Sequence, residues 1–404
     1  MDERKNILGD VINMAVKTNY SKNGRAYFRV SAVLGTDSSG KRIIKEFYGK
    51  SKSEAESKKR EYLDGIKNGL SIDNKNLSLG NLMHIWLFEI IRVSDKIKPS
   101  TFERYEGIYR RYIKDSPLYL IKLDSIRTLD IQRYYNSLSS MGKSKNIILA
   151  LNKLLKQFLF YAVDEGYLIK NPCVSKRIVI PGENTMSKEV DHLTDAELKI
   201  LMGNLDGNKY KEVILLSLGT GLRRGEILAL TWDDIDLDNN MINVNKSLSK
   251  VYIIEGDETR ERKQIIQSPK SMHSIRTIPF PESLKHLFRD LQVKQKINKL
   301  RCGKSYKNSN YVFVSECGEN VELYNLANNW NKLLKDLEIP HKKFHALRHT
   351  YATKLFEKGV PLKTVSELLG HSSIDITADI YTHVMPKEKT NAVEKLNSFF
   401  AENL

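Results

Sequence analysis

The chain has 404 residues, a length that excludes a single ordinary domain and predicts two or three domains with separate cores. Its 65 Lys and Arg residues against 49 Asp and Glu residues give a net charge of +16, which favours a polyanionic partner such as nucleic acid. Three cysteines without CxxC spacing argue against a disulfide framework. Because the chain also lacks a signal-peptide core and any run of eighteen apolar residues, we expect a cytoplasmic protein that does not span a membrane.

The first predicted domain, residues 1–70, combines a β-hairpin with one helix. Polar and apolar side chains alternate over residues 26–31, and a second strand at 41–48 follows a turn rich in Gly, Asp and Ser. A charged helical pattern covers 51–67. A two-stranded ribbon can enter the DNA major groove, so this region is predicted to bind DNA, unless its basic face is only a solvated surface. The candidate DNA contacts are Lys22, Arg25, Tyr27 and Arg29.

The second predicted domain, residues 71–182, is almost entirely helical after a polar, Asn-rich linker. Apolar residues recur at helical spacing over 82–90 and 147–158, and Pro99 suits the start of a helix. That helix mixes tyrosines with three basic residues that are candidate DNA contacts, Arg110, Arg111 and Lys114. The bundle could clamp core DNA. An alternative is a helical spacer whose tyrosines lie in the core.

The third predicted domain, residues 187–404, begins after a polar linker that contains Pro181 and Gly182. Thr194 and Glu197 have the spacing of a capping box, which predicts a helix start. We predict helices to about residue 230, strands at 241–248, 251–255 and 275–280, and helices again from 281. The predicted fold class is therefore multidomain and mainly α with small β elements.

One stretch near the end of the chain, residues 344–384, concentrates groups that suit a phosphodiester. His345 and Arg348 lie three residues apart and share one side of a predicted helix. Gly370 is expected to cap a second helix and to place His371 just beyond its end. A late tyrosine, Tyr381, follows. Each residue taken alone has an ordinary structural explanation.

Two upstream motifs add cationic side chains. The sequence TGLRRGE places Arg223 and Arg224 on a turn before a helix, where a guanidinium can bind a phosphate through two N–H groups. The sequence SPKSMHSIRTIP places Lys270 on or beside a β turn that leads into a strand. Taken singly, charged residues at such positions are more often solvated than catalytic.

The motifs TGLRRGE, SPKSMHSIRTIP, HALRHT, LLGH and IYTH, in this order, resemble the tyrosine recombinase (phage integrase) family. The three-domain layout is similar to that of integrases of temperate phages and of conjugative transposons of Gram-positive bacteria. The resemblance implies that Tyr381 is the nucleophile, and Arg224 is a second choice for the first arginine. The implied catalytic set is Arg223, Lys270, His345, Arg348, His371 and Tyr381.

The resemblance also implies what the protein does. It would integrate and excise a mobile element by cleaving and rejoining DNA through a 3′-phosphotyrosine and a Holliday junction. Because the phosphotyrosine conserves the bond energy, neither a nucleotide nor a metal cofactor is expected. The implied partners are double-stranded DNA with core and arm sites, an excision factor, and three further copies of the chain in a tetramer on synapsed DNA, with a monomer off DNA. The site of action would be the bacterial cytoplasm.

Several alternatives stay open from the sequence. A type IB topoisomerase shares the phosphotyrosine chemistry, and residues 355–369 could form the helix-turn-helix of a non-catalytic regulator. His341, His345 and His349 have a spacing that permits a zinc site, although no carboxylate or cysteine partner accompanies them. An amphipathic helix is predicted over 386–401, and it would pack on its own domain or on a neighbouring copy.

Overall fold

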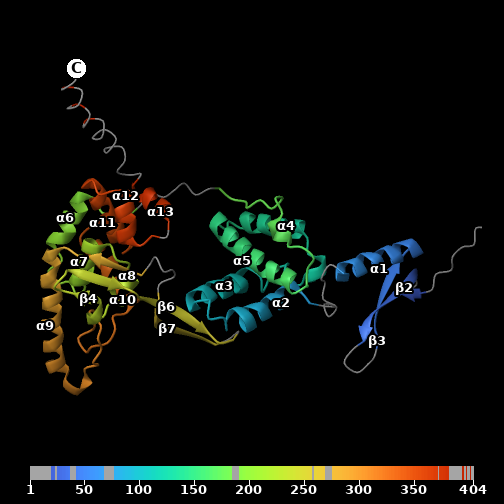
Figure 1. Cartoon of the computed structure of the whole chain (residues 1–404), viewed down its shortest axis with the longest axis horizontal. Helices are drawn as coiled ribbons and strands as arrows, with labels where there is room; N and C mark the ends of the chain where they lie inside the picture. The colour runs from blue at the N-terminus through green and yellow to red at the C-terminus, as the bar shows by residue number, and fades with distance from the viewer. Residues whose placement is uncertain are drawn as a thin grey trace, which may run out of the picture. The chain divides into compact units, whose positions relative to one another are not determined.

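The computed structural model describes residues 20–22, 25–36, 42–67, 77–183, 191–256, 259–268, 275–371 and 373–381, with Glu394, Asn397 and Ala401. The chain divides into two compact units, Met1–Asn184 and Thr185–Leu404. Helices dominate both units and the sheets have two or three strands, which confirms the predicted fold class (Figure 1).

The N-terminal sheet has the antiparallel order β1 (Tyr20–Lys22), β2 (Arg25–Thr36) and β3 (Arg42–Gly49), and α1 (Lys52–Lys67) packs against β2 and β3 (Figure 1). Ala32, Phe47 and Ala55 are buried between sheet and helix. The predicted hairpin and helix are confirmed. Strand β1 was not predicted, because three residues are too few to display an alternation.

The rest of this unit is a helical bundle. Its elements are α2 (Leu79–Ile85), the π-helix η1 (Trp86–Ile91), α3 (Pro99–Tyr112), η2 (Leu123–Ser125), α4 (Thr128–Ser140), α5 (Lys145–Asp164) and η3 (Pro172–Val174). Pro99 occupies the first turn of α3, as predicted. Tyr109 lies in the core at 2% exposure, whereas Arg110 and Arg111 are exposed, so α3 separates a packing face from a basic face.

Helix α5 is the one helix of the described ranges that is long and apolar enough to cross a membrane by length and composition. The sequence analysis did not single it out, because polar residues such as Asn152 and Lys153 interrupt its apolar run. Seven of its apolar side chains lie inside the bundle, as in the core helix of a helical domain, while Phe160 is exposed. The buried residues are Ile148, Leu151, Leu154, Leu155, Phe158, Leu159 and Ala162.

The second unit places small strands among helices. In chain order it contains α6 (Asp195–Gly203), α7 (Lys211–Thr220), α8 (Arg224–Ile227), η4 (Trp232–Asp234), β4 (Ile235–Asp236), β5 (Met241–Val244), β6 (Ser247–Ile254), β7 (Arg260–Gln267), β8 (Arg276–Pro279), η6 (Glu282–Leu284), α9 (Lys285–Cys302), η7 (Gly303–Ser305), α10 (Leu323–Asp336), α11 (Ala346–Glu357), α12 (Leu362–Leu369) and α13 (Ile374–Tyr381). One core joins α7, α9, α10 and the sheet, with Ile214, Phe288 and Trp330 at its centre. The capping box of Thr194 and Glu197 at the start of α6 is confirmed.

The strands of this unit form two separate antiparallel sheets. Strands β4, β5 and β8 make one sheet, and β6 pairs with β7 in a hairpin. The prediction missed β7 and divided β6 in two. Strand β7 reads RERKQIIQ, and its first residues are charged on both faces, so they carry no apolar alternation. The pairing with β6 therefore decides its conformation.

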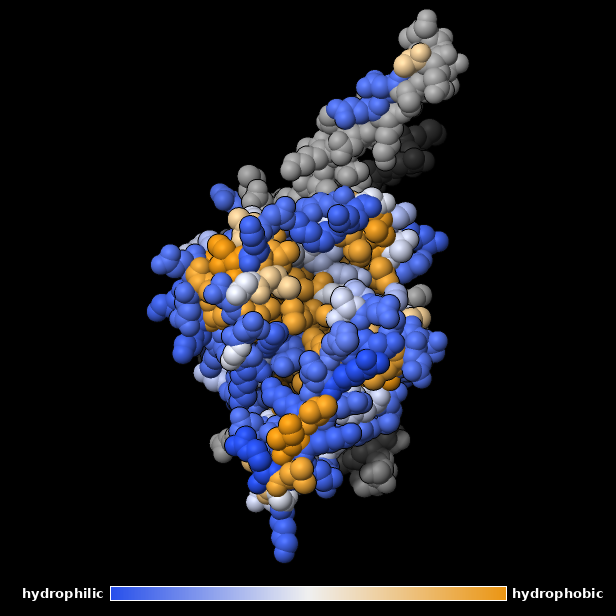
Figure 2. Space-filling view, turned by 90° about the vertical axis from the view of Figure 1, so that its left-hand side faces the viewer, coloured by the Kyte–Doolittle hydropathy of each residue, from blue (hydrophilic) through white to orange (hydrophobic). Residues whose placement is uncertain are grey.

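Hydrophobic side chains are grouped on the face of the molecule that Figure 2 shows, within a mostly hydrophilic surface. Helix α9, at the left edge of Figure 1, contributes three exposed apolar residues at helical spacing, Val293, Ile297 and Leu300. Leu300 is 85% exposed. The solvent-exposed side of α9 therefore carries apolar as well as polar side chains.

Candidate active site

The candidate site of the second unit is built where the α7–α8 turn meets helices α11 and α12. Helix α11 packs on α7, α12 and α13. Apolar side chains from α11 and α12 form a small core of Ala352, Phe356, Val365 and Leu369. This packing brings the His345/Arg348 pair close to residues more than a hundred positions upstream.

Arg348 is the most buried charged side chain among the described residues of the site, at 1% exposure. Its guanidinium donates to two backbone carbonyls, that of Gly221 at 2.8 Å and that of Leu369 at 2.6 Å, while its Nε has no hydrogen-bond partner within the described ranges. Burial lowers the pKa of Arg348 below its ordinary value, and the charge of Arg223 lowers it further. A guanidinium nevertheless keeps its proton in proteins. A cation is therefore held inside the domain by neutral oxygens.

Two glycines make this approach possible. Gly221 has a φ of 64°, and a Cβ there would lie 2.3 Å from the ring of Tyr351. Gly370 has the same φ, and a Cβ there would lie 2.9 Å from Cδ of Arg276. Both are left-handed positions with no room for a side chain, so glycine is required at each. The predicted cap at Gly370 is confirmed.

Arg223 precedes α8 and is partly exposed, with 36% of its side chain accessible. It donates to the Glu226 carboxylate at 2.8 Å and to the Gly370 carbonyl at 3.3 Å. Arg224, the competing candidate, is half-buried, and burial lowers its pKa. Of the two candidates, Arg223 therefore makes the described contacts to Glu226 and Gly370.

Glu226 and Arg276 are two residues of the site that the sequence analysis did not assign. Arg276 of β8 donates to Glu226 at 3.0 Å and to the Leu368 carbonyl at 2.9 Å. Burial alone would raise the pKa of Glu226, but the charges of Arg276 and Arg223 outweigh it and lower the pKa, so the carboxylate is ionised. Both residues lie inside quoted motifs. Their pairing across fifty positions has no local signal.

The histidines lie beside these cations. His345 caps the start of α11, and its ring meets that of His349 edge to face at 4.7 Å between centroids. Desolvation first, and then the charges of His349 and Arg348, lower the pKa of His345 to about 4. His345 is exposed in the DNA-free chain, so water weakens the effect of the neighbouring charges on its pKa. The pKa is still below its ordinary value, so the imidazole is neutral at pH 7.

His371 follows the Gly370 cap, as predicted. Its Nδ1 is 2.7 Å from Oγ1 of Thr377, a fully buried residue of α13, and this bond orients the ring. Burial and the charges of Arg348 and Arg223 lower the pKa of His371 to about 3. The backbone thus brings Arg223, Arg348, His345 and His371 into one electrostatic environment.

The two remaining members of the predicted set are less fully defined. Tyr381 is the last residue of α13, a helix that packs on α11 and α12, but its side chain is not among those described. Lys270 lies outside the described residues, between β7 and β8. The predicted helix over 386–401 also falls almost wholly outside them.

The DNA-contact candidates of the first unit are distributed unevenly. The side chains of Lys22 and Arg25 are not described, and Tyr27 is half-buried. Arg29 forms an ion pair with Glu46 at 3.1 Å, which offsets part of its charge. The three candidates on and after α3, Arg110, Arg111 and Lys114, are exposed.

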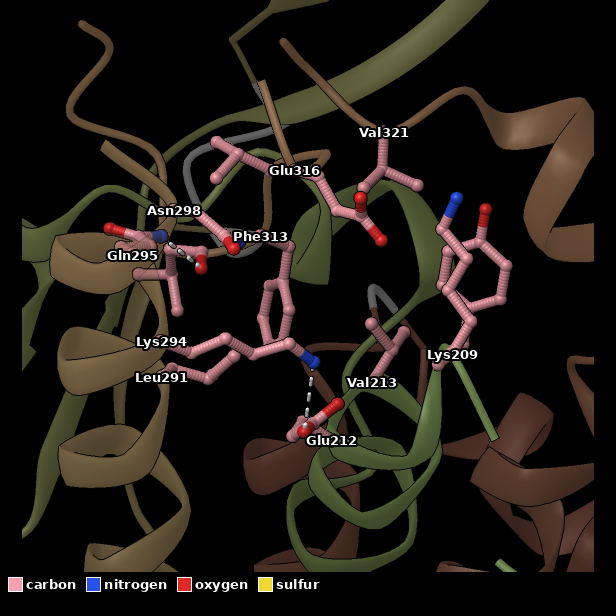
Figure 3. A pocket seen from close by; sticks show the side chains of 13 residues that line it. Lys209, Glu212, Val213, Leu291, Lys294, Gln295, Asn298, Phe313, Glu316 and Val321 are labelled. Atoms are coloured by element: carbon pink, nitrogen blue, oxygen red, sulfur yellow. Dashed lines mark hydrogen bonds and ion pairs between the residues drawn. The ribbon is translucent and has the colours of Figure 1, made fainter. Parts of the chain in front are cut away.

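A cavity of about 80 Å³ lies elsewhere in the second unit, between α7, α9 and residues 312–321 (Figure 3). Lys294 and Glu212 point toward one another there and form an ion pair at 3.7 Å. The described candidate catalytic residues do not line this cavity. Among the described residues, no three His, Cys, Asp or Glu side chains converge as metal ligands, so the zinc alternative gains no support.

Comparisons with known proteins identify the family of the chain. The family model "Phage integrase family" matches residues 187–388, and "Phage integrase, N-terminal SAM-like domain" matches 78–139. A "Tyrosine recombinase XerC-like" protein of Caldanaerobacter subterraneus subsp. tengcongensis is 53% identical, over 96% of this chain and 100% of the relative. The transposase of transposon Tn916 from Enterococcus faecalis is 25% identical, over 71% of this chain and 72% of the relative.

Solved structures share the fold. The Tn1549 transposon integrase in complex with transposon right end DNA aligns with a TM-score of 0.63 at 23% identity, over 80% of this chain and 100% of that chain. A lambda integrase dimer bound to a core site aligns with a TM-score of 0.51 at 20% identity, over 75% of this chain and 95% of that chain. The chain therefore belongs to the phage integrase family of tyrosine recombinases, enzymes that transfer DNA strands between specific sites.

Proposed function

We propose that this recombinase integrates and excises a mobile genetic element, with Tyr381 as the nucleophile. The observation that carries the proposal is the cluster of cations around the end of α12. Arg348 is buried on two carbonyls with no carboxylate of the described residues in contact, and Arg223 is partly exposed beside it. Such positive charge, held in place before any ligand arrives, suits a phosphodiester.

The proposed chemistry assigns one task to each side chain. The phenol oxygen of Tyr381 attacks phosphorus, the bond to the 5′ oxygen breaks, and the 3′ phosphate stays joined to the tyrosine. Arg223 and Arg348 stabilise the charge on the non-bridging oxygens, a form of preorganised electrostatic catalysis. A second DNA end then attacks the phosphotyrosine and restores the phosphodiester through a Holliday junction.

Proton transfer is proposed for the remaining groups. A phenol has an ordinary pKa of about 10, so Tyr381 needs a base or nearby cations before it attacks. The lowered pKa of His345 leaves its imidazole neutral and able to accept a proton at pH 7. His371, oriented by Thr377, donates to the phosphate, and Lys270 supplies a proton to the leaving 5′ oxygen.

We propose a division of labour along the chain. Residues 1–70 bind arm sites, 71–182 bind core DNA through α3, and 187–404 carry the catalytic site. The exposed basic side chains of α3 and the net charge of +16 support DNA binding in this arrangement. The Tn1549 and lambda integrases were solved on DNA, which supports the same partner here. The chain acts on DNA in the bacterial cytoplasm.

Assembly is also part of the proposal. A monomer off DNA would form a tetramer on synapsed sites, and an excision factor would bias the direction. The tail helix predicted over 386–401 would dock on a neighbouring copy. Deleting residues 387–404 should then weaken the synaptic complex on native gels while single-site binding persists. Unchanged assembly on DNA would reject this role of the tail.

A covalent-adduct assay tests the chemistry. The chain is incubated with a nicked duplex that spans the ends of the element, and denaturing gels are examined for protein joined to DNA. Tyr381→Phe should abolish the adduct and keep DNA binding. Tyr324→Phe is the matched control, because Tyr324 is an exposed tyrosine of α10 in the same unit.

The outcomes separate the alternatives. Tight binding without any adduct would favour a non-catalytic regulator. An adduct that relaxes supercoils but never joins two DNAs would favour a type IB topoisomerase. An adduct that persists in Tyr381→Phe would overturn the assignment of the nucleophile.

A further inference from the structure

We infer that Arg276 is a positioning residue for strand cleavage. Arg276 holds the Glu226 carboxylate, so that the charge of Arg223 stays available to the phosphate. Arg276 also fixes the end of α12, which precedes His371. The inference rests on the proposed function of Arg223. Arg276 itself is 8% exposed at its side chain and acts through its neighbours.

Three guanidinium groups reach three consecutive carbonyls at the end of α12. Arg276 Nε donates to Leu368 at 2.9 Å. Arg348 Nη2 donates to Leu369 at 2.6 Å, and Arg223 Nη2 donates to Gly370 at 3.3 Å. The last carbonyls of a helix lack partners within the helix, and its C-terminal end favours cations. The arginines therefore set the position of the residue that follows, His371.

One carboxylate is shared by two of these arginines. Glu226 Oε1 accepts from the Arg223 guanidinium at 2.8 Å and from Arg276 at 3.4 Å, while its Oε2 accepts from Arg276 at 3.0 Å and from the backbone N–H of Arg223 at 3.0 Å. Because Arg276 meets both oxygens, the single negative charge is divided between two cations. Arg223 is thus only partly neutralised, and it is the more accessible of the two, with 36% of its side chain exposed against 8% for Arg276.

Loss of Arg276 should change this balance. Glu226 would then have Arg223 as its only arginine partner among those described. The guanidinium of Arg223 could form a bidentate pair with both carboxylate oxygens of Glu226, and this pair would draw it away from the phosphate. The carboxylate would also stay ionised, because Arg223 still lies beside it. Removing the negative charge as well, with Gln at position 226, should free Arg223 again. A purely structural role of Arg276 gives no reason for such a rescue.

The test is a double-mutant cycle on single-turnover cleavage of the nicked duplex. Arg276→Met should slow cleavage by about 100-fold, which is close to the rate loss caused by removing one preorganised donor. The double variant Arg276→Met/Glu226→Gln should cleave about 10-fold faster than Arg276→Met. Arg276→Lys should lie between, since it keeps the charge but not three directed bonds. Arg289→Met, an exposed arginine of α9, controls for the loss of one positive charge.

Two further measurements keep the result interpretable. DNA affinity in a Tyr381→Phe background should change little across the series, and thermal unfolding reports whether each variant is folded. Without DNA, the reaction of Arg223 with phenylglyoxal, followed by mass spectrometry, should slow in Arg276→Met and recover in the double variant.

The inference is overturned if folded Arg276→Met cleaves at the wild-type rate, or if the double variant is as slow as the single one. It is also overturned if phenylglyoxal modifies Arg223 equally in all variants. Absence of any adduct in the wild type would reject the proposed function instead. The phenylglyoxal series would still decide the role of Arg276 in positioning Arg223.

Discussion

Replacing Arg348 by Met should alter the stability of the DNA-free chain little, although the side chain is almost fully buried. The change removes two hydrogen bonds from a charged donor, to Gly221 and Leu369. At about 1.5–3 kcal/mol each, these bonds contribute about 3–6 kcal/mol. The same change removes a buried cation for which the described part of the chain provides no carboxylate in contact, and this returns several kcal/mol of desolvation cost. We therefore expect a net loss within about 2 kcal/mol.

Arg276→Met is the matched comparison. Arg276 is also buried, but it forms an ion pair with the Glu226 carboxylate. Removing it should cost about 3 kcal/mol, the lower end of the range for a buried pair broken on one side, because Arg223 still lies beside Glu226. Urea unfolding of the full chain, followed by tryptophan fluorescence, should rank the wild type above Arg348→Met and Arg348→Met above Arg276→Met. Trp330, in the core of the second unit, reports on this part of the fold.

Cleavage should fall in both variants. Because Arg348→Met is expected to stay folded, its loss of cleavage does not come from unfolding. Arg348→Met should lose at least about 100-fold in adduct formation, because a donor to the transition state is absent. If Arg348→Met were instead destabilised as much as Arg276→Met in the DNA-free chain, the hydrogen bonds of Arg348 to the two carbonyls would outweigh the desolvation cost of its charge. The description of Arg348 as a cation held for a ligand would then be wrong.

Three more predictions concern pH, backbone and thiols. The pKa of His371 is lowered to about 3 from an ordinary value near 6.5, so as pH falls the imidazole is protonated in the unfolded chain before it is protonated in the folded one. The stability that depends on this imidazole is therefore full above about pH 6.5 and declines toward pH 3. His371→Gln should flatten the urea midpoint as a function of pH over this range. Gly221→Ala should destabilise the chain and slow cleavage, because a methyl group would meet the Tyr351 ring at a positive φ, and unchanged melting would contradict this. The Sγ atoms of Cys302 and Cys317 are 3.3 Å apart, so diamide should join them in an intrachain disulfide that peptide mapping detects and that Cys302→Ser abolishes.

Local signals in the sequence were sufficient for many elements. Pro99 marks the start of α3, Thr194 with Glu197 caps α6, and Gly370 ends α12, because each works through atoms within about four residues. The order of short motifs was also enough to identify the family, whose membership the comparisons confirm. Strand β7 was missed because its charged start has no apolar alternation.

The sequence by itself therefore determined the helices, the family and the set of candidate groups. Only the tertiary structure decided how those groups are paired. Arg348 meets the Gly221 carbonyl 127 positions away, and Arg223 meets the Gly370 carbonyl 147 positions away. Glu226 and Arg276 come together because β8 and α8 pack in one core, and no periodicity records such a contact. The physical reason is that hydrophobic packing brings distant backbone ends together, and the cations then satisfy whichever carbonyls are left there.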